Sequence, residues 1–95
     1  MNYLKDLGFD QNTINIINES LPKKALETLE TKKEIVIKNV KYMKELGISN
    51  YQVAFVKFYN MFLMDNEEFD EIFSKYDKED LVVKLEKNVA IMEYL

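Results

Sequence analysis

Carboxylate and lysine side chains are the groups in this 95-residue sequence with the chemistry to hold an ion or act on a substrate. The densest carboxylate run is Asp65-Asn66-Glu67-Glu68-Phe69-Asp70-Glu71. Its carboxylates do not follow the ligand spacing of an EF-hand loop, and the run lacks the glycine that such a loop needs. We therefore expect no metal site in this run.

Catalytic chemistry is restricted further by what the composition leaves out. The sequence contains no histidine and no cysteine, which removes the commonest general base, the commonest transition-metal ligand and the thiolate nucleophile. Its only glycines, Gly8 and Gly47, stand at expected helix ends, so there is no phosphate-binding loop, dinucleotide fingerprint or nucleophile elbow. We predict that the chain is not an enzyme, with no catalytic residue and no cofactor.

Lysines gather in one part of the sequence. Residues 23–44 hold seven lysines and three glutamates, whereas residues 65–80 hold eight carboxylates and two lysines. On a helix, Lys33, Lys41 and Lys44 lie within about 80° of one another, a stripe able to follow phosphates. The candidate nucleic-acid residues are Lys33, Lys38, Lys41 and Lys44.

Two observations weigh against nucleic acid as the main partner. The sequence has no arginine, the residue on which bidentate phosphate and base recognition depend, and its net charge is −4. A solvated basic face is the favoured interpretation of the stripe. Alternatively, the basic and acidic segments meet in a homo-oligomer or steer a charged protein partner.

The length of the chain predicts a single helical domain over residues 1–95, with a thin core. The N-terminus alternates polar and apolar residues, unlike a signal peptide. The longest nearly apolar stretch, residues 53–64, is too short to span a bilayer. We expect a cytoplasmic protein without a membrane partner.

Helix boundaries are legible because caps and breakers recur at short intervals. Gly8, Pro22 and Gly47 mark ends or starts of helices, and no stretch alternates with a strand period for long. Thr31 and Ser49 each open a capping box with a Glu or Gln three residues later. The predicted N-terminal caps are Asp10, Thr31, Ser49, Asp65 and Asp77. The expected fold is all-α, a compact array of six to seven short helices.

The helix expected over residues 50–64 is apolar almost all round. Such a helix is either central in its domain or part of an interface, and a domain of this size barely encloses a helix on every side. Aromatic residues suit both interpretations. If the helix forms a partner or dimer surface, its residues are Tyr51, Phe55, Phe58, Tyr59 and Phe62.

Asn39 and Asn88 fall on the apolar faces of their expected helices. Because a buried amide needs hydrogen-bond partners, we expect each to tie down the backbone of an adjoining turn, with ligand binding as the alternative.

An internal repeat is visible around the two glycines. Residues 3–10, YLKDLGFD, align with residues 42–49, YMKELGIS, and residues 88–95 align with residues 39–46. These separations are typical of helical repeat arrays and predict two repeat-like helical units, about 4–46 and 43–95. The alternative is that a helix ending on glycine before a cap is simply a common connection.

The stretch Leu7-Gly8-Phe9-Asp10, Ile14, Ile17, Leu21-Pro22, followed by a long helix into Leu46-Gly47-Ile48-Ser49, resembles the helical repeat of the mitochondrial transcription termination factor family. The resemblance covers mainly residues 4–49 and implies the shape of the fold. Members of that family are basic nucleic-acid binders with more repeats, whereas this chain is short and acidic.

The function predicted from these observations is a non-enzymatic protein-interaction module, a small regulator or adaptor acting through an aromatic-rich helix surface. Its partner is another protein or a second copy, with a homodimer favoured. The alternative is a nucleic-acid-associated helical-repeat protein that uses the lysine stripe.

Overall fold

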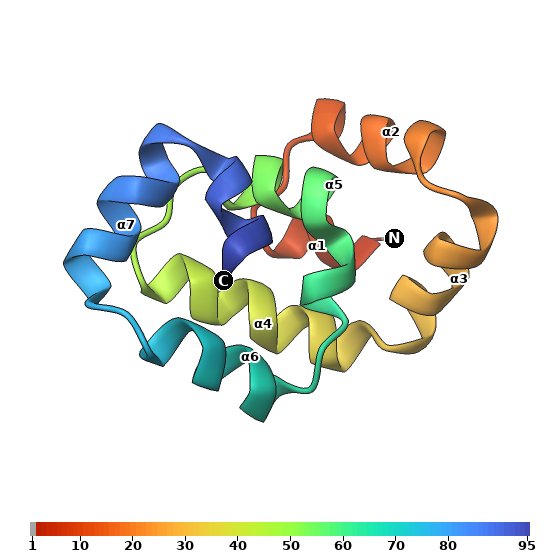
Figure 1. Cartoon of the computed structure of the whole chain (residues 1–95). Coiled ribbons are helices and arrows are strands. Elements are labelled where there is room, and N and C mark those ends of the chain that lie inside the picture. The colour runs from red at the N-terminus through yellow and green to blue at the C-terminus, as the bar shows by residue number, and fades with distance from the viewer. Residues whose placement is uncertain (1) are drawn as a thin grey trace.

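The computed structural model describes residues 2–95, and all regular structure in that range is helical (Figure 1). This confirms the all-α class. Seven α-helices and a 3-10 helix follow one another through short connections: α1 (Asn2–Asp6), α2 (Gln11–Ser20), α3 (Lys23–Thr31), α4 (Lys33–Glu45), α5 (Tyr51–Phe62), α6 (Asn66–Ser74), α7 (Lys78–Lys87) and η1 (Val89–Tyr94). The molecule measures 35 × 25 × 23 Å.

Helices α4 and α5 lie at the centre of this arrangement (Figure 1). Helix α4 packs against α1, α3, α5 and α6, and α5 packs against α2, α4 and η1. The apolar residues of α4 recur at helical spacing, with Val36, Val40 and Met43 completely buried. The two central helices therefore organise the core, and the other helices cover them.

Aromatic rings in close contact run through this core. Phe55 of α5 lies with its ring centroid 5.2 Å from those of Phe9 and Phe62. Phe62 continues to Phe69 of α6 at 5.4 Å, and Phe69 to Phe73 at 4.7 Å. Because each fully buried Phe is worth about 1.5–3 kcal/mol relative to its exposed state, this row is a main source of stability.

Three of the five predicted caps are confirmed. The carboxylates of Asp10, Asp65 and Asp77 accept hydrogen bonds from backbone N–H groups in the first turns of α2, α6 and α7. The boxes at Thr31 and Ser49 were wrong. The Thr31 hydroxyl donates back to the carbonyl of Glu27, because α3 runs on through Thr31.

Ser49 does not cap α5, because it is hydrogen-bonded to a residue far along the chain. Its hydroxyl and its backbone N–H both donate to the carboxylate of Glu86 in α7, at 2.6 and 2.5 Å. Helix α5 starts one residue later, after Asn50, whose amide donates to the carbonyl of Leu85 at 2.9 Å. A tertiary contact has thus replaced the local cap.

The two glycines take the left-handed conformation predicted for them. Gly8 has φ of 102° and Gly47 has φ of 95°, values open to glycine at little cost. After each glycine, the next residue donates back to the carbonyl five residues earlier: Phe9 to Leu4 at 3.0 Å and Ile48 to Met43 at 3.4 Å. Both helices therefore end in the same Schellman-type turn.

The third aligned segment differs from the other two. Residues 89–94 form the 3-10 helix η1, whereas the matching residues of the second copy lie in α4. Asn88 was also expected on a buried face, but it is exposed and its side chain caps η1 by accepting from the N–H of Ala90 at 3.1 Å. The division into two repeat units therefore stays a prediction that rests on the two glycine turns.

The two glycine turns give a matched pair of substitutions. A Cβ at Gly8 would lie 2.8 Å from the Tyr51 hydroxyl and 3.2 Å from the Lys44 ammonium, whereas at Gly47 it would meet nothing within 4 Å. We expect Gly47→Ala to lower the free energy of unfolding by about 1 kcal/mol through strain alone, and Gly8→Ala by about 2–3 kcal/mol. Urea unfolding measures both, and equal losses would contradict the crowding at Gly8.

Asn39 is the one buried polar side chain of residues 2–95, with 1% of its surface exposed. Its Nδ2 donates to the carbonyls of Phe62 and Met64, both at 2.9 Å. Its Oδ1 accepts from Nδ2 of Asn66 at 2.8 Å, and Asn66 also donates to the carbonyl of Ile35. Asn39 thus ties α4 to the connection between α5 and α6, a structural role in agreement with the favoured expectation.

Candidate protein-interaction surface

The predicted interface residues of α5 do not share one exposed face. Phe55 and Phe62 have 0% of their surface exposed, because Phe9, Phe69 and the surrounding helices cover them within the chain. A partner cannot touch either ring unless the domain opens. Their assignment to an interface was therefore wrong, and the central-helix interpretation holds for this side of α5.

The other three predicted interface residues are half-buried and pack against the core: Tyr51, Phe58 and Tyr59. The Tyr51 ring meets Phe9 edge to face with the two centroids 5.5 Å apart, and the Lys44 ammonium lies 5.2 Å from the Tyr51 centroid. Phe58 has non-helical backbone angles, φ −131° and ψ 41°, and kinks α5 near its middle. These rings mainly serve packing within the chain.

The exposed apolar face of α5 is instead formed by Val53. Val53 lies opposite Ile16 of α2, a residue that the sequence analysis did not single out. Val53 is 46% exposed and Ile16 of α2 is 47% exposed. Both line a shallow groove of about 200 Å³ between the two helices. We call this groove the α2–α5 surface; its residues are Thr13, Ile16, Gln52, Val53, Val56 and Lys57.

Ile16 was missed at the sequence level, although a signal existed. Ile14 and Ile17, one helical turn apart, form the buried face of α2. Ile16 points away from them, among Asn12, Asn15 and other polar residues. A large aliphatic residue on the polar side of an amphipathic helix is not expected to be fully covered by its own chain, and this marks it as a contact candidate.

Gln52 joins the two walls of the α2–α5 surface. Its Oε1 accepts from the backbone N–H of Asp10 at 3.0 Å, and its Nε2 donates to the carbonyl of Gly8 at 3.4 Å. The first turn of α5 is therefore fixed to the turn that starts α2, so the groove is preformed. A preformed surface binds with a smaller entropic cost than one that must be ordered.

The α2–α5 surface is also poor in charge. About a third of the whole chain is charged, yet residues 11–18 of α2 and residues 51–56 of α5 contain no charged side chain. Amides replace the charges on α2, where Gln11 donates to Asn15 at 2.9 Å. Depletion of charge at an apolar centre is the compositional feature that separates interfaces from other surfaces.

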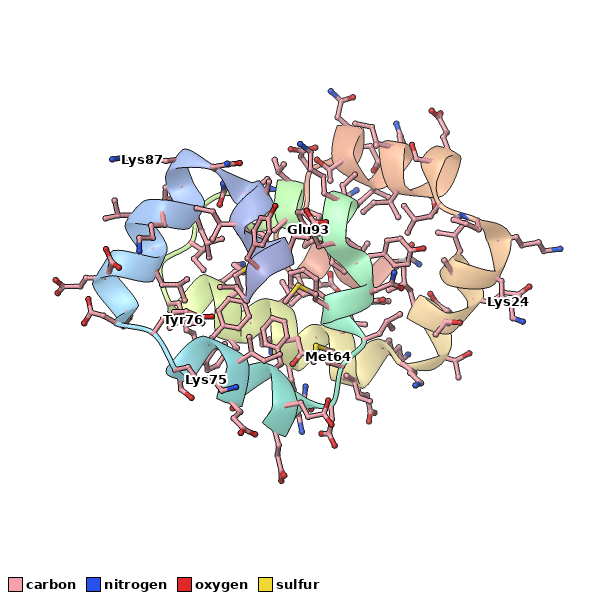
Figure 2. All side chains as sticks on the ribbon, viewed as in Figure 1. Lys24, Met64, Lys75, Tyr76, Lys87 and Glu93 are labelled. Atoms are coloured by element: carbon pink, nitrogen blue, oxygen red, sulfur yellow. The ribbon has the colours of Figure 1, made fainter. Side chains whose placement is uncertain are left out.

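A second apolar area lies between α7 and η1. Tyr94 is 80% exposed, and with Tyr76, Ile91 and Leu95 it lines a groove of about 140 Å³. Figure 2 shows Tyr76 beside the α6–α7 connection, away from α2. The ion pair between Asp80 and Lys84, at 3.0 Å, borders this groove, so it is more polar than the α2–α5 surface.

The four lysines of the candidate nucleic-acid stripe are all exposed, but their surroundings differ. The Lys44 ammonium donates to the carbonyl of Leu7 at 2.5 Å. Lys38 and Lys41 share a groove of about 290 Å³ with the carboxylates of Glu45 and Asp70. These carboxylates would repel a phosphate backbone, which weakens the nucleic-acid alternative.

Among the described residues, each titratable group with a clearly shifted pKa has a structural cause. Burial raises the pKa of Tyr3, whose hydroxyl donates to the carbonyl of Leu29 at 2.8 Å, and burial also raises the pKa of Tyr42. Hydrogen bonds from Thr13 lower the pKa of Asp10, and those from Ser49 lower that of Glu86. Residues 2–95 bring together no group of three potential metal ligands.

Comparison of the chain with family models, with curated proteins and with solved structures returns no match. The resemblance to mitochondrial transcription termination factor repeats therefore stays a prediction. Within the described part of the chain, no helix has the length and apolar character needed to cross a membrane.

Proposed function

We propose that this protein is a non-enzymatic interaction module that binds a protein partner through the α2–α5 surface. The proposal is carried by one observation: two large aliphatic side chains from different helices, Ile16 and Val53, are each about half exposed in the same preformed, charge-poor groove. The proposal moves the interface from the aromatic side of α5, where the sequence predicted it, to the aliphatic side.

The energetic contribution of this surface is modest and testable. Covering the exposed halves of Ile16 and Val53 contributes about 1–2 kcal/mol in total, equivalent to roughly a tenfold change in dissociation constant. A carboxylate in the same place makes an unfavourable contribution to the binding free energy, because an unpaired charge must be dehydrated on binding. A single aspartate in the groove is therefore expected to weaken binding strongly while changing the isolated domain little.

Site-specific cross-linking tests the proposal. A photoreactive amino acid replaces Val53 in one variant and Val83, which is 51% exposed on α7 outside the groove, in a matched control. In the cells that make the protein, we expect adducts of defined mass from position 53 only. An excess of unlabelled wild-type protein should lower the yield of these adducts by occupying the partner, whereas an excess of the Ile16→Asp variant should leave the yield unchanged.

Equal adduct yields at positions 53 and 83, or competition by Ile16→Asp as strong as by wild type, would remove the α2–α5 surface as the binding site. Because Ile16 and Val53 are half exposed, the Ile16→Asp variant and the variant with the photoreactive amino acid at position 53 are expected to keep the wild-type circular dichroism spectrum. This spectrum serves as the folding control.

A further inference from the structure

We infer that α7 and η1, residues 78–94, form a flap that detaches from the domain and unfolds as one unit while the other helices stay folded. The contact between Glu86 of the flap and Ser49 of the α4–α5 connection is its latch. This device goes beyond the proposed function, and none of the residues of the α2–α5 surface belongs to it. Proteins open locally in cooperative units of this kind, and units with few buried apolar contacts open first.

The flap is attached to the rest of the domain through a small contact. Helix α7 packs mainly against η1, and η1 packs against α5, whereas α4 at the centre packs against four other helices. Figure 1 shows α7 at one edge of the molecule and η1, in dark blue, folded back beside α5. In η1, Met92 is buried, but Val89 and Ile91 are only partly buried. Little apolar surface therefore holds η1 against α5.

The helix that makes this contact is itself weakly stabilised. η1 is a 3-10 helix of six residues, whereas 3-10 runs longer than three or four residues are uncommon because their hydrogen-bond geometry is poor. Its first turn depends on the exposed side chain of Asn88, whose Oδ1 accepts from the N–H of Ala90 at 3.1 Å. Because short helices are unstable in isolation, loss of the contact with α5 is expected to unfold η1.

The latch joins α7 to the α4–α5 connection. The carboxylate of Glu86 accepts from the backbone N–H and the hydroxyl of Ser49, and the neighbouring carbonyl of Leu85 accepts from the amide of Asn50. Hydrogen bonds to a carboxylate are charge-assisted and stronger than those between neutral groups. Ser49 and Glu86 are both exposed, so water replaces their hydrogen bonds when the flap opens. The latch therefore stabilises the closed form moderately and reversibly.

A buried oxygen beside the latch destabilises the closed form. Oδ1 of Asn50 is buried and has no hydrogen-bond partner within residues 2–95. The same amide group donates to the carbonyl of Leu85 in α7, so it lies at the boundary between the flap and the α4–α5 connection. A buried acceptor without a donor is unfavourable because it has lost its water. Opening of the flap returns this oxygen to water and so offsets part of the lost packing.

The closed flap covers apolar surface. Leu81 and Leu85 of α7 are buried, as is Met92 of η1, and η1 covers part of α5. This surface becomes accessible when the flap opens, so the open form exposes an apolar area that the closed form withholds from other molecules. A change that weakens the latch raises the population of the open form.

Native-state hydrogen exchange of the whole chain, measured for single amides by NMR, tests the inference. In the wild type, we expect the amides of α7 and η1 to share one opening constant, at least about tenfold larger than that of the α4 amides. Glu86→Ala removes both acceptors of Ser49 and should raise the opening constant of the flap by about five- to tenfold. Glu93→Ala, which removes an exposed carboxylate from η1, is the matched control and should change it by less than about twofold.

A substitution outside the flap separates its opening from unfolding of the whole domain. Ile17 of α2 is completely buried, and Ile17→Val should speed exchange of the α4 amides by about fivefold while leaving the α7 and η1 amides within about twofold of wild type. Equal acceleration of all three helices by Ile17→Val would show that the flap opens only with the whole domain, and would overturn the inference. Unchanged exchange of α7 and η1 in Glu86→Ala would remove the contact with Ser49 as the latch.

Discussion

Replacing Phe55 by alanine is expected to lower the free energy of unfolding by about 3–5 kcal/mol. Phe55 is completely buried and its ring contacts both Phe9 and Phe62, so its loss leaves a cavity between α5 and the turn before α2. For a domain of this size the loss is a large part of the total stability, which is typically about 5–15 kcal/mol. Urea unfolding followed by circular dichroism measures it.

Phe58→Ala is the control for this experiment, since it removes the same side chain from the same helix. Phe58 is half-buried, so we expect a loss smaller than that of Phe55→Ala by about 1–2 kcal/mol. If the two variants lost equal stability, or if Phe55→Ala stayed as stable as wild type, Phe55 would not be the central core residue that the structure shows.

Replacing Asn39 by alanine is expected to lower the free energy of unfolding by about 2–4 kcal/mol. The variant leaves the carbonyls of Phe62 and Met64 without their donor and removes one of the two acceptors of the Asn66 amide. Each buried polar group that loses its partner costs about 1–3 kcal/mol, and water entry recovers part of the sum. Thermal unfolding at a fixed protein concentration measures the change.

Asn60→Ala is the control for Asn39, because Asn60 is an exposed asparagine on α5, and we expect it to change stability by less than about 0.5 kcal/mol. The pair Asn39 and Asn66 should also be coupled. The double variant is expected to lose less than the two single variants together, since each single change already breaks the hydrogen bond between them. Strict additivity would show that this hydrogen bond contributes nothing.

Features that depend on a few neighbouring residues were predictable from the sequence. The left-handed glycines at positions 8 and 47 and the caps at Asp10, Asp65 and Asp77 follow from backbone and side-chain chemistry within one helical turn. The all-α class follows from the same local signals taken together. The caps predicted at Thr31 and Ser49 used equally local signals and failed, Ser49 because Glu86, 37 residues away, binds it.

The covered side of α5 was not predictable in the same way. A helix that is apolar almost all round does not show clearly which side meets solvent, and the prediction chose the aromatic side with Phe55 as the partner surface and left out Val53. The distinction depends on Phe9 and α4 arriving over one side and only α2 partly covering the other. Such long-range packing is settled by the whole chain, and no periodicity within α5 encodes it.

The break at Phe58 divides α5 into two short helical segments with different neighbours. Val53 and Val56, on the first segment, line the groove beside α2. Phe62, on the second segment, is held through its carbonyl by Asn39 and through its ring by Phe69 of α6. The bend thus lets one helix serve the groove at one end and the junction with α4 and α6 at the other.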